Sequence, residues 1–137
     1  YFLDETYELF RRNQTWWYPL SELDFTQINE ACKLFTQYDN YIALCRFNPE
    51  LSNHLSKVTQ ADWCYFGPEK RVIFKVKANR YLRNQIRRMV GCLVDIGRGK
   101  LSLQDLEESL RNGTPLKYNK AAPPQGLFLW NVKYPYL

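Results

Sequence analysis

The feature that most constrains the fold is a change in hydrophobic spacing between residues 72 and 96. Val72, Phe74 and Val76 alternate with the basic residues Lys75 and Lys77, which is the two-residue period of a β-strand with one buried face. Beyond them the apolar residues recur three and four positions apart, which is the period of an amphipathic helix. They are Leu82, Ile86, Met89, Val90, Cys92, Leu93 and Ile96. The spacing predicts a strand that leads directly into a helix over residues 80–96, with this apolar arc on its core side.

A second extended segment, residues 55–66, precedes this strand. Gly67 and Pro68 lie between the two segments, and both are residues that favour tight turns. We therefore expect an antiparallel β-hairpin that ends near residue 78. The stretch Asn-Pro-Glu-Leu-Ser-Asn, residues 48–53, is interpreted as a break in the chain before the hairpin.

Two further helices are predicted from capping residues and apolar spacing. Asp24 precedes an apolar stripe of helical period, and Gln27 stands three residues later, which is an approximate capping box for a helix over residues 24–38. Ser102 is the expected start of a shorter helix, which has an acidic residue in its first turn and stops at Gly113.

Weaker alternation at both ends of the chain predicts further strands, over residues 1–10 and 127–134. Strands and helices are mixed along the chain, without repeats, low-complexity segments or an interdomain linker. We therefore predict a single α+β domain over residues 1–137, with a mainly antiparallel sheet and helices packed on one face.

The composition excludes several classes of protein. No apolar run approaches the roughly 18 to 20 residues of a membrane span, so no membrane is expected as a partner. The four cysteines include no C-x-x-C pair, and His54 is the sole histidine, so no metal site is expected. Free thiols fit a reducing compartment, which predicts a cytoplasmic location.

Positive charge is concentrated in one block of the chain, although the formal net charge is only +5. Residues 70–100 carry ten Lys and Arg side chains against Asp95 alone, a net charge of +9, whereas the other 106 residues carry −4. A solvated basic face is the ordinary explanation of such a block. An acidic domain with one basic block nevertheless favours a polyanionic partner.

Four of these basic residues are arginines within nine positions. Arg80, Arg83 and Arg87 form a row opposite the apolar arc of the predicted helix. Gly91 continues the row, and Arg88 lies to another side. Glycine inside a helix costs about 0.5 to 1 kcal/mol relative to alanine, so we interpret it as open backbone that lets a partner approach. A guanidinium can hold a phosphate through two hydrogen bonds. We therefore favour a nucleic acid as the ligand of these arginines, over the alternative of an exposed face whose arginines pair with Asp or Glu. The preference for RNA over DNA is only weak.

Other residues near the arginines fit the same partner. Lys75 and Lys77 alternate with the apolar residues of the hairpin, and their ammonium groups are suited to contacts with a phosphate backbone. Tyr81 can stack on a base, although packing in a core is the more frequent use of an aromatic residue.

Three blocks of the sequence carry a resemblance to a known family. They are ANRYLRNQIRRMVG from Ala78, VDIGRG from Val94 and PPQGLFL from Pro123. Together they resemble the C-terminal half of the tRNA pseudouridine synthase A (TruA) family. The likeness extends over residues 15–136 and is strongest from residue 72 onward.

The resemblance implies a fold, a substrate and a reaction. The fold would be the C-terminal subdomain of the pseudouridine synthase fold. The reaction would be the isomerisation of uridine to pseudouridine in the anticodon stem-loop of tRNA, with no metal and no organic cofactor. The partner would be tRNA, and the full-length protein would be a homodimer.

The resemblance also assigns roles to residues. Family members pair an arginine of this helix with the catalytic Asp, and the block match places that arginine at Arg87. Leu127 would lie against the target base. A low pKa suits a nucleophilic carboxylate, and a fixed guanidinium supplies it. The other expected substrate-binding residues are Gly126, Arg83, Arg80, Arg88, Tyr81, Asn79 and Lys77.

The sequence also departs from the family pattern. The catalytic Asp of the family lies in a G-R-T-D-x-G-V-H motif, and no R-T-D occurs here. A second motif, G-x-[HQ]-D-F-[ST]-x-F, is reduced to a stretch in which Asp39 remains. Since the chain also lacks an initial Met, we expect a piece of a longer enzyme that is inactive by itself. Two alternatives stay open, a non-catalytic RNA-binding module and a dimerisation domain.

Overall fold

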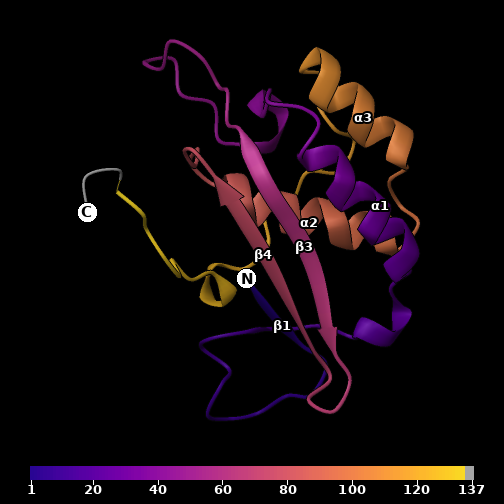
Figure 1. Cartoon of the computed structure of the whole chain (residues 1–137). Helices are drawn as coiled ribbons and strands as arrows, with labels where there is room; N and C mark the ends of the chain where they lie inside the picture. Colours follow the sequence, from indigo (N-terminus) through magenta and orange to yellow (C-terminus); the bar gives the residue numbers. More distant parts are fainter. Residues whose placement is uncertain (135–137) are drawn as a thin grey trace.

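The computed structural model describes residues 1–134 as a four-stranded sheet with α-helices on one face (Figure 1). The strands are β1 (Phe2–Asp4), β2 (Trp16–Trp17), β3 (Val58–Phe66) and β4 (Arg71–Ala78), in the spatial order β2-β1-β4-β3. β4 is antiparallel to both β3 and β1, whereas β1 and β2 are parallel over two residue pairs. The predicted α+β fold and the predicted hairpin are therefore confirmed, in a sheet that is mixed and mainly antiparallel.

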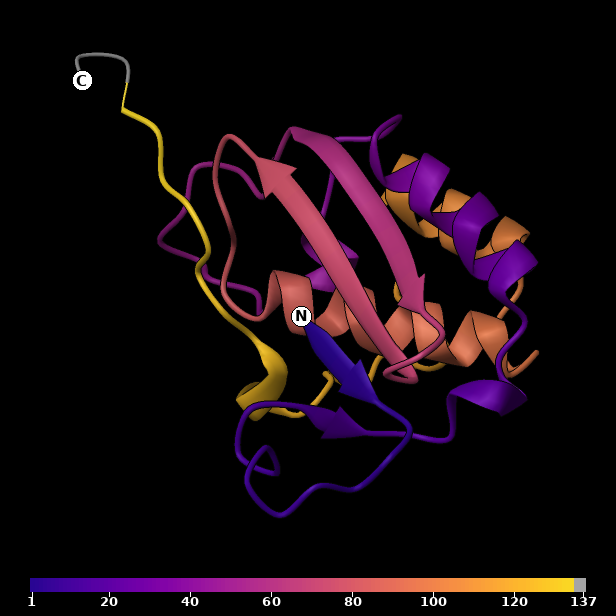
Figure 2. The ribbon, with the colours of Figure 1, turned by 60° about the horizontal axis from the view of Figure 1, so that its bottom comes forward.

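The helices are α1 (Phe25–Phe35), α2 (Gln85–Gly97) and α3 (Leu103–Asn112). α1 packs against β3, α2 and α3, so the helices form one layer behind the sheet (Figure 2). The predicted caps are present, because the Asp24 carboxylate accepts a hydrogen bond from the Gln27 amide at 3.2 Å, and Ser102 begins α3 with a capping box. No helix among residues 1–134 is long and apolar enough to cross a bilayer.

The hairpin separates a buried face of the sheet from an open face. Trp63 of β3 pairs with Phe74 of β4, and both side chains are buried against the helices. The adjacent pair, Asp62 and Lys75, is exposed on the opposite face, as strand alternation requires. All seven residues of the predicted apolar arc are buried, which confirms that this arc is the core side.

The predicted strand at residues 127–134 is wrong. These residues belong to no strand, and Leu129 and Trp130 are 77% and 86% exposed. A strand needs a neighbouring strand to satisfy its amide and carbonyl groups, and none of the four strands in the described part of the chain pairs with this segment, although Phe128 packs on Phe2 of β1.

At the other end of the chain, the strand predicted over residues 1–10 is present only as Phe2–Asp4. The chain leaves the sheet after Asp4, and turns over residues 9–14 carry it back to β2. The buried Asp4 carboxylate is bound there by Arg71 of β4, with its two oxygens 2.7 and 3.0 Å from the guanidinium nitrogens. This ion pair links the two central strands of the sheet, at the point where β1 ends and β4 begins.

Candidate nucleic-acid interface

The arginine-rich segment divides into a loop and a helix, not into one helix as predicted. α2 begins at Gln85, because Asn84 adopts a left-handed backbone conformation with φ of 63°, which interrupts helical geometry. Arg80 and Arg83 therefore belong to residues 79–84, which we call the arginine loop, and only Arg87 and Arg88 lie on α2. The predicted row of three arginines on one helical face does not form.

A buried glutamine holds the arginine loop in place. The Gln85 side chain accepts a hydrogen bond from the Leu82 amide at 2.9 Å and donates one to the Ser56 hydroxyl at 3.1 Å. That hydroxyl donates in turn to the Arg80 carbonyl at 2.7 Å. Gln85 is fully buried and its polar atoms are paired, so the network rigidifies the loop. Nothing in the sequence pattern distinguished Gln85 from a solvent-exposed residue.

The Arg87 guanidinium is half-buried and fixed by neutral acceptors. Its Nε donates to the Ala122 carbonyl at 2.7 Å, and one terminal nitrogen donates to the Asn84 side chain at 3.4 Å. The backbone repeats this contact, since the Ala122 amide donates to the Arg87 carbonyl at 2.8 Å. Within residues 1–134, no Asp or Glu forms an ion pair with Arg87. The side chain is therefore oriented, and its charge is available to an anion.

The interpretation of Gly91 as open backbone is wrong. A Cβ atom at Gly91 would lie 1.9 Å from the Lys120 carbonyl oxygen, so the space beside this glycine is filled by the chain itself. A Cβ at Gly126 would similarly lie 2.8 Å from the Phe2 carbonyl oxygen. Two glycines thus let residues 120–126 lie directly against α2 and β1. The close approach inferred from the sequence is real, but the partner is internal.

This docked segment places the predicted base-contacting residue beside the sheet. Leu127 follows the short turn Pro124–Gly126, called η3, and its side chain is 41% exposed. The Tyr1 hydroxyl donates to the Pro123 carbonyl at 2.5 Å, which ties the segment to the edge of β1. Burial raises the pKa of the Tyr1 phenol, and the positive charge of Arg87 opposes that rise only in part. Tyr1 therefore remains a protonated donor here, and no motif in the sequence pointed to it.

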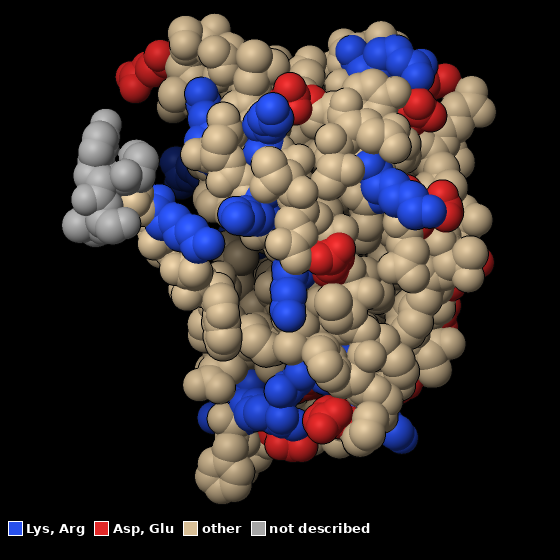
Figure 3. All heavy atoms as spheres, viewed as in Figure 1, with Lys and Arg blue, Asp and Glu red and all other residues tan. Residues whose placement is uncertain are grey.

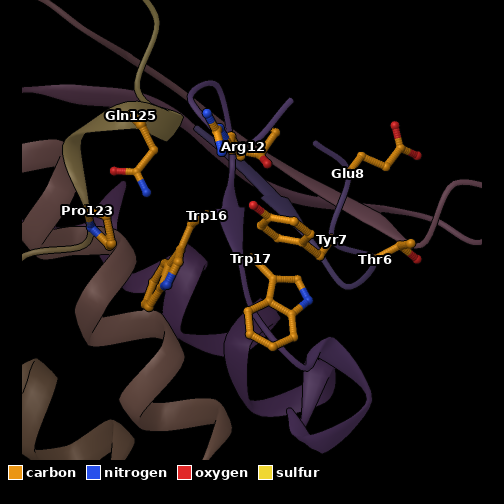
Figure 4. Close-up of a pocket in the computed structure, with 9 residues that line it drawn as sticks. Thr6, Tyr7, Glu8, Arg12, Trp16, Trp17, Pro123 and Gln125 are labelled. Atoms are coloured by element: carbon orange, nitrogen blue, oxygen red, sulfur yellow. The ribbon is translucent and has the colours of Figure 1, made fainter. Parts of the chain in front are cut away.

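A hollow of about 310 Å³ lies on the other side of η3 (Figure 4). Aromatic side chains of β2 and of the segment that precedes it form one wall, and η3 forms the other. The labelled residues are Thr6, Tyr7, Glu8, Arg12, Trp16, Trp17, Pro123 and Gln125. Since Pro123 directly follows the alanine that binds Arg87, this aromatic hollow and the Arg87 position share one supporting segment.

Several predicted substrate-binding residues also have structural contacts. Arg80 donates to the Asn53 carbonyl at 3.2 Å, and Arg88 donates to the Cys45 carbonyl at 2.9 Å. Both guanidinium groups therefore secure the chain that precedes β3, while they retain their charge.

Asn79 and Tyr81 likewise make local hydrogen bonds. The Asn79 side chain accepts from the Lys57 amide at 2.8 Å, and the Tyr81 hydroxyl accepts from the Ala78 amide at 3.1 Å. Arg83 and Lys77 are exposed, and neither side chain has a hydrogen bond or ion pair with another of the residues 1–134. The last two are the predicted residues most accessible to a ligand.

The positive charge gathers where the arginine loop meets the sheet. In Figure 3, Lys and Arg side chains run from the upper left to the centre of the face, over the ends of β3 and β4 near the arginine loop. Lys75 and Lys77 project from the open face of β4. Such a run of basic side chains attracts the phosphates of a nucleic acid, although Asp62 lies opposite Lys75 on the same face.

Comparisons with known proteins agree with this chemistry. A family model described as tRNA pseudouridine synthase matches residues 31–135, which is more than half of the chain. The chain belongs to the tRNA pseudouridine synthase family. Within this family, it is 34% identical to the tRNA pseudouridine synthase A of Bacteroides fragilis, over 82% of this chain and 44% of that protein.

Two further relatives match almost the whole chain. The tRNA pseudouridine synthase A of Exiguobacterium sibiricum is 34% identical over 98% of this chain and 53% of its own length. That of Methylacidiphilum infernorum is 34% identical over 96% of this chain and 51% of its own length. The chain thus spans about half the length of the curated relatives it matches, as expected for the C-terminal half of a family member.

Proposed function

We propose that this chain is the C-terminal domain of a tRNA pseudouridine synthase, an isomerase that converts uridine to pseudouridine in the anticodon stem-loop of tRNA. The observation that carries the proposal is the state of Arg87. Its guanidinium is oriented by Ala122 and Asn84 and has no carboxylate partner within residues 1–134. An arginine held in this way is suited to pair with a catalytic Asp supplied by the rest of the full-length protein.

Arg87 would contribute to the reaction in two ways. A carboxylate beside a fixed guanidinium has a lowered pKa, so it is ionised and can attack the uridine or its sugar. Hydrogen bonds from the guanidinium of Arg87 to this carboxylate would also orient it toward the reacting atoms. The glycosidic C–N bond then breaks, the base rotates, and a C–C bond forms to the sugar. The base carbon that joins the sugar loses one proton, and the base nitrogen released from the sugar gains one. The isomerisation is therefore balanced and needs no redox cofactor and no metal.

The residues around Arg87 would hold the nucleotide during this reaction. A base that leaves its stack needs an apolar surface to lie on, and Leu127 is partly exposed beside η3. Gly126 fixes where Leu127 emerges, because its missing side chain lets η3 touch β1. Arg83 and Lys77 would bind phosphates of the stem, and Arg80, Arg88, Asn79 and Tyr81 would support that surface from the arginine loop and its neighbours.

The full-length protein would act on tRNA in the cytoplasm as a homodimer. The domain described here, residues 1–137, would be inactive alone, since its sequence contains no R-T-D motif. A second candidate function is a non-catalytic RNA-binding module that uses the same basic surface. A dimerisation domain is the third candidate, and a strictly monomeric mass in solution would exclude it.

A direct assay separates the first two candidates. The full-length protein and the isolated chain are incubated with an unmodified tRNA transcript, and pseudouridine is detected by its specific chemical labelling. We expect pseudouridine with the full-length protein and none with the isolated chain. Binding of tRNA by the full-length protein without any pseudouridine would instead establish the RNA-binding module. Absence of both binding and product would refute both functions.

A further inference from the structure

The loop before β3, residues 45–55, is built onto the arginine loop. The Arg46 amide donates to the Arg83 carbonyl at 2.8 Å. Arg80 and Arg88 secure the same loop through the Asn53 and Cys45 carbonyls. We interpreted part of this loop from the sequence only as a chain break. In the structure it is a shaped extension of the basic surface, which we call the platform loop.

An aromatic pair caps the platform loop. The rings of Phe47 and His54 are stacked, with centroids 5.0 Å apart and planes inclined by 18°. His54 is buried, and its Nε2 accepts a hydrogen bond from the Asn48 backbone amide at 3.2 Å. This bond fixes the orientation of the His54 ring, on which Phe47 stacks. Phe47 is 61% exposed, so one face of its ring lies on His54 and the other is open. An apolar ring is more stable buried than exposed to water, so a partner that covered the open face of Phe47 would gain binding free energy.

The open ring is flanked by cations. A hollow of about 310 Å³ is lined by Arg46, Phe47 and Arg83, together with Asn48, Pro49 and Glu50. Both arginines are exposed. Among residues 1–134, no ion pair neutralises either of them or the two arginines that hold the loop. The site therefore combines a flat apolar surface with two arginines that form no ion pair within the described residues, against the single carboxylate of Glu50 in the same lining.

We infer that Phe47 is a stacking platform for an unpaired base of the RNA substrate, with Arg46 and Arg83 on the adjoining phosphates. This inference rests on the proposed function and adds a contact outside the Arg87 site. Aromatic rings among basic residues are the means by which proteins bind single-stranded nucleic acid, because every base has a face that can stack. A base within a duplex does not offer that face, so the platform would bind a loop nucleotide or an unstacked one.

The charge distinguishes RNA from a protein partner at this site. A protein that covered Phe47 would have to bring acidic side chains to both arginines and would bury a ring already supported by His54. A single nucleotide brings its base and its phosphate together, which matches an open ring in a hollow that two arginines also line. The platform would thus fix the orientation of the tRNA while the target uridine enters the Arg87 site.

The test measures the dissociation constant of full-length protein and a whole tRNA transcript for a series of Phe47 variants. Phe47→Ala should weaken binding about 5- to 150-fold, the range for loss of one stacked base. Phe47→Trp should bind as well as wild type or better, whereas Phe47→Leu, which keeps an apolar side chain without a flat face, should behave like Phe47→Ala. Phe66→Ala is the matched control, because Phe66 is also exposed but lies at the far end of β3.

The salt dependence provides a second readout. Phe47→Ala should leave the slope of log K against log salt unchanged, since no charge is lost, and Arg46→Ala should reduce its magnitude by about one. Tight binding by wild type together with equal binding by Phe47→Ala would overturn the platform and leave the proposed function intact. Retained affinity in Phe47→Leu would show an apolar contact rather than stacking and would overturn it as well. Failure of wild type to bind tRNA would instead refute the proposed function.

Discussion

Arg87 and Gly91 occupy adjacent turns of α2 but meet the same segment of chain in different ways. Arg87 reaches Ala122 with its side chain and its carbonyl, and Gly91 lets Lys120 approach the helix backbone. The first contact orients a charge, and the second sets the distance at which residues 120–126 lie from α2. Each residue is thus explained by a contact made about thirty positions later in the sequence.

Gly91→Ala tests this close approach by the sign of its effect. In a free helix the change would stabilise by about 0.5 to 1 kcal/mol, because alanine is the better helix former. Here the new methyl group would meet the Lys120 carbonyl, so we expect a loss of about 1 to 3 kcal/mol in the free energy of unfolding. Urea denaturation measures the difference. Gly67→Ala, whose Cβ would meet no atom closer than 3.9 Å, is the control, and a more stable Gly91→Ala would contradict the structure.

Arg83 and Lys77 are predicted to contribute charge rather than structure. Each is exposed, so Arg83→Ala or Lys77→Ala in the full-length protein should leave the thermal midpoint nearly unchanged. Each should weaken tRNA binding and reduce the magnitude of the salt slope by about one, as loss of one phosphate contact does. Titrations at several salt concentrations provide the measurement. An unaltered slope would remove that residue from the RNA surface.

At the scale of the elements, local patterns predicted what local contacts determine. The hairpin and the three helices were found because turn residues, caps and apolar periods act over a few positions. The start of α2 was missed, because Asn84 leaves helical geometry at a position where the apolar spacing continues. Leu82 fits the helical spacing of the apolar residues, but it is buried in the core from its position in the arginine loop.

Longer-range features were beyond the sequence alone. The alternation at residues 127–134 is genuine, but a strand also requires a neighbour, and the described residues supply none. For the candidate site, resemblance to the family predicts a role for Arg87, whereas its acceptor at Ala122 and the stacking of Phe47 on His54 depend on folding. Arg80 and Arg88 were predicted as ligands of RNA from their charge, yet both first bind carbonyls that shape a loop.

For the whole molecule, buried thiol and phenol groups make the free energy of unfolding fall at alkaline pH. Burial raises the pKa of the Cys32 thiol from 9.0 to about 12, and it also raises the pKa of Cys92 and Tyr41. The unfolded chain ionises first, so the stability that these groups contribute is complete below pH 9 and is lost as the pH rises toward 12. Between the ordinary pKa of each group, 9.0 for the thiols and 10.0 for Tyr41, and its raised pKa in the folded protein, the free energy of unfolding should fall by about 1.4 kcal/mol per pH unit.

Urea denaturation at intervals between pH 8 and pH 11 measures this slope. Cys32→Ala should lower the stability at pH 8, because it leaves a cavity, but should show a shallower decline with pH than wild type. Equal slopes in the two proteins would contradict the assignment of Cys32 to the pH dependence.

The proposed function depends most on Arg87 as the partner of a catalytic carboxylate. The measurement that tests it is the turnover number for pseudouridine formation by the full-length protein, together with its dissociation constant for tRNA, in Arg87→Ala. Arg98→Ala, which removes an exposed arginine at the other end of α2, is the control. We predict a loss of about 10² to 10³ in turnover for Arg87→Ala, with a much smaller change in affinity, and wild-type values for the control. Unchanged turnover in Arg87→Ala would contradict the central claim.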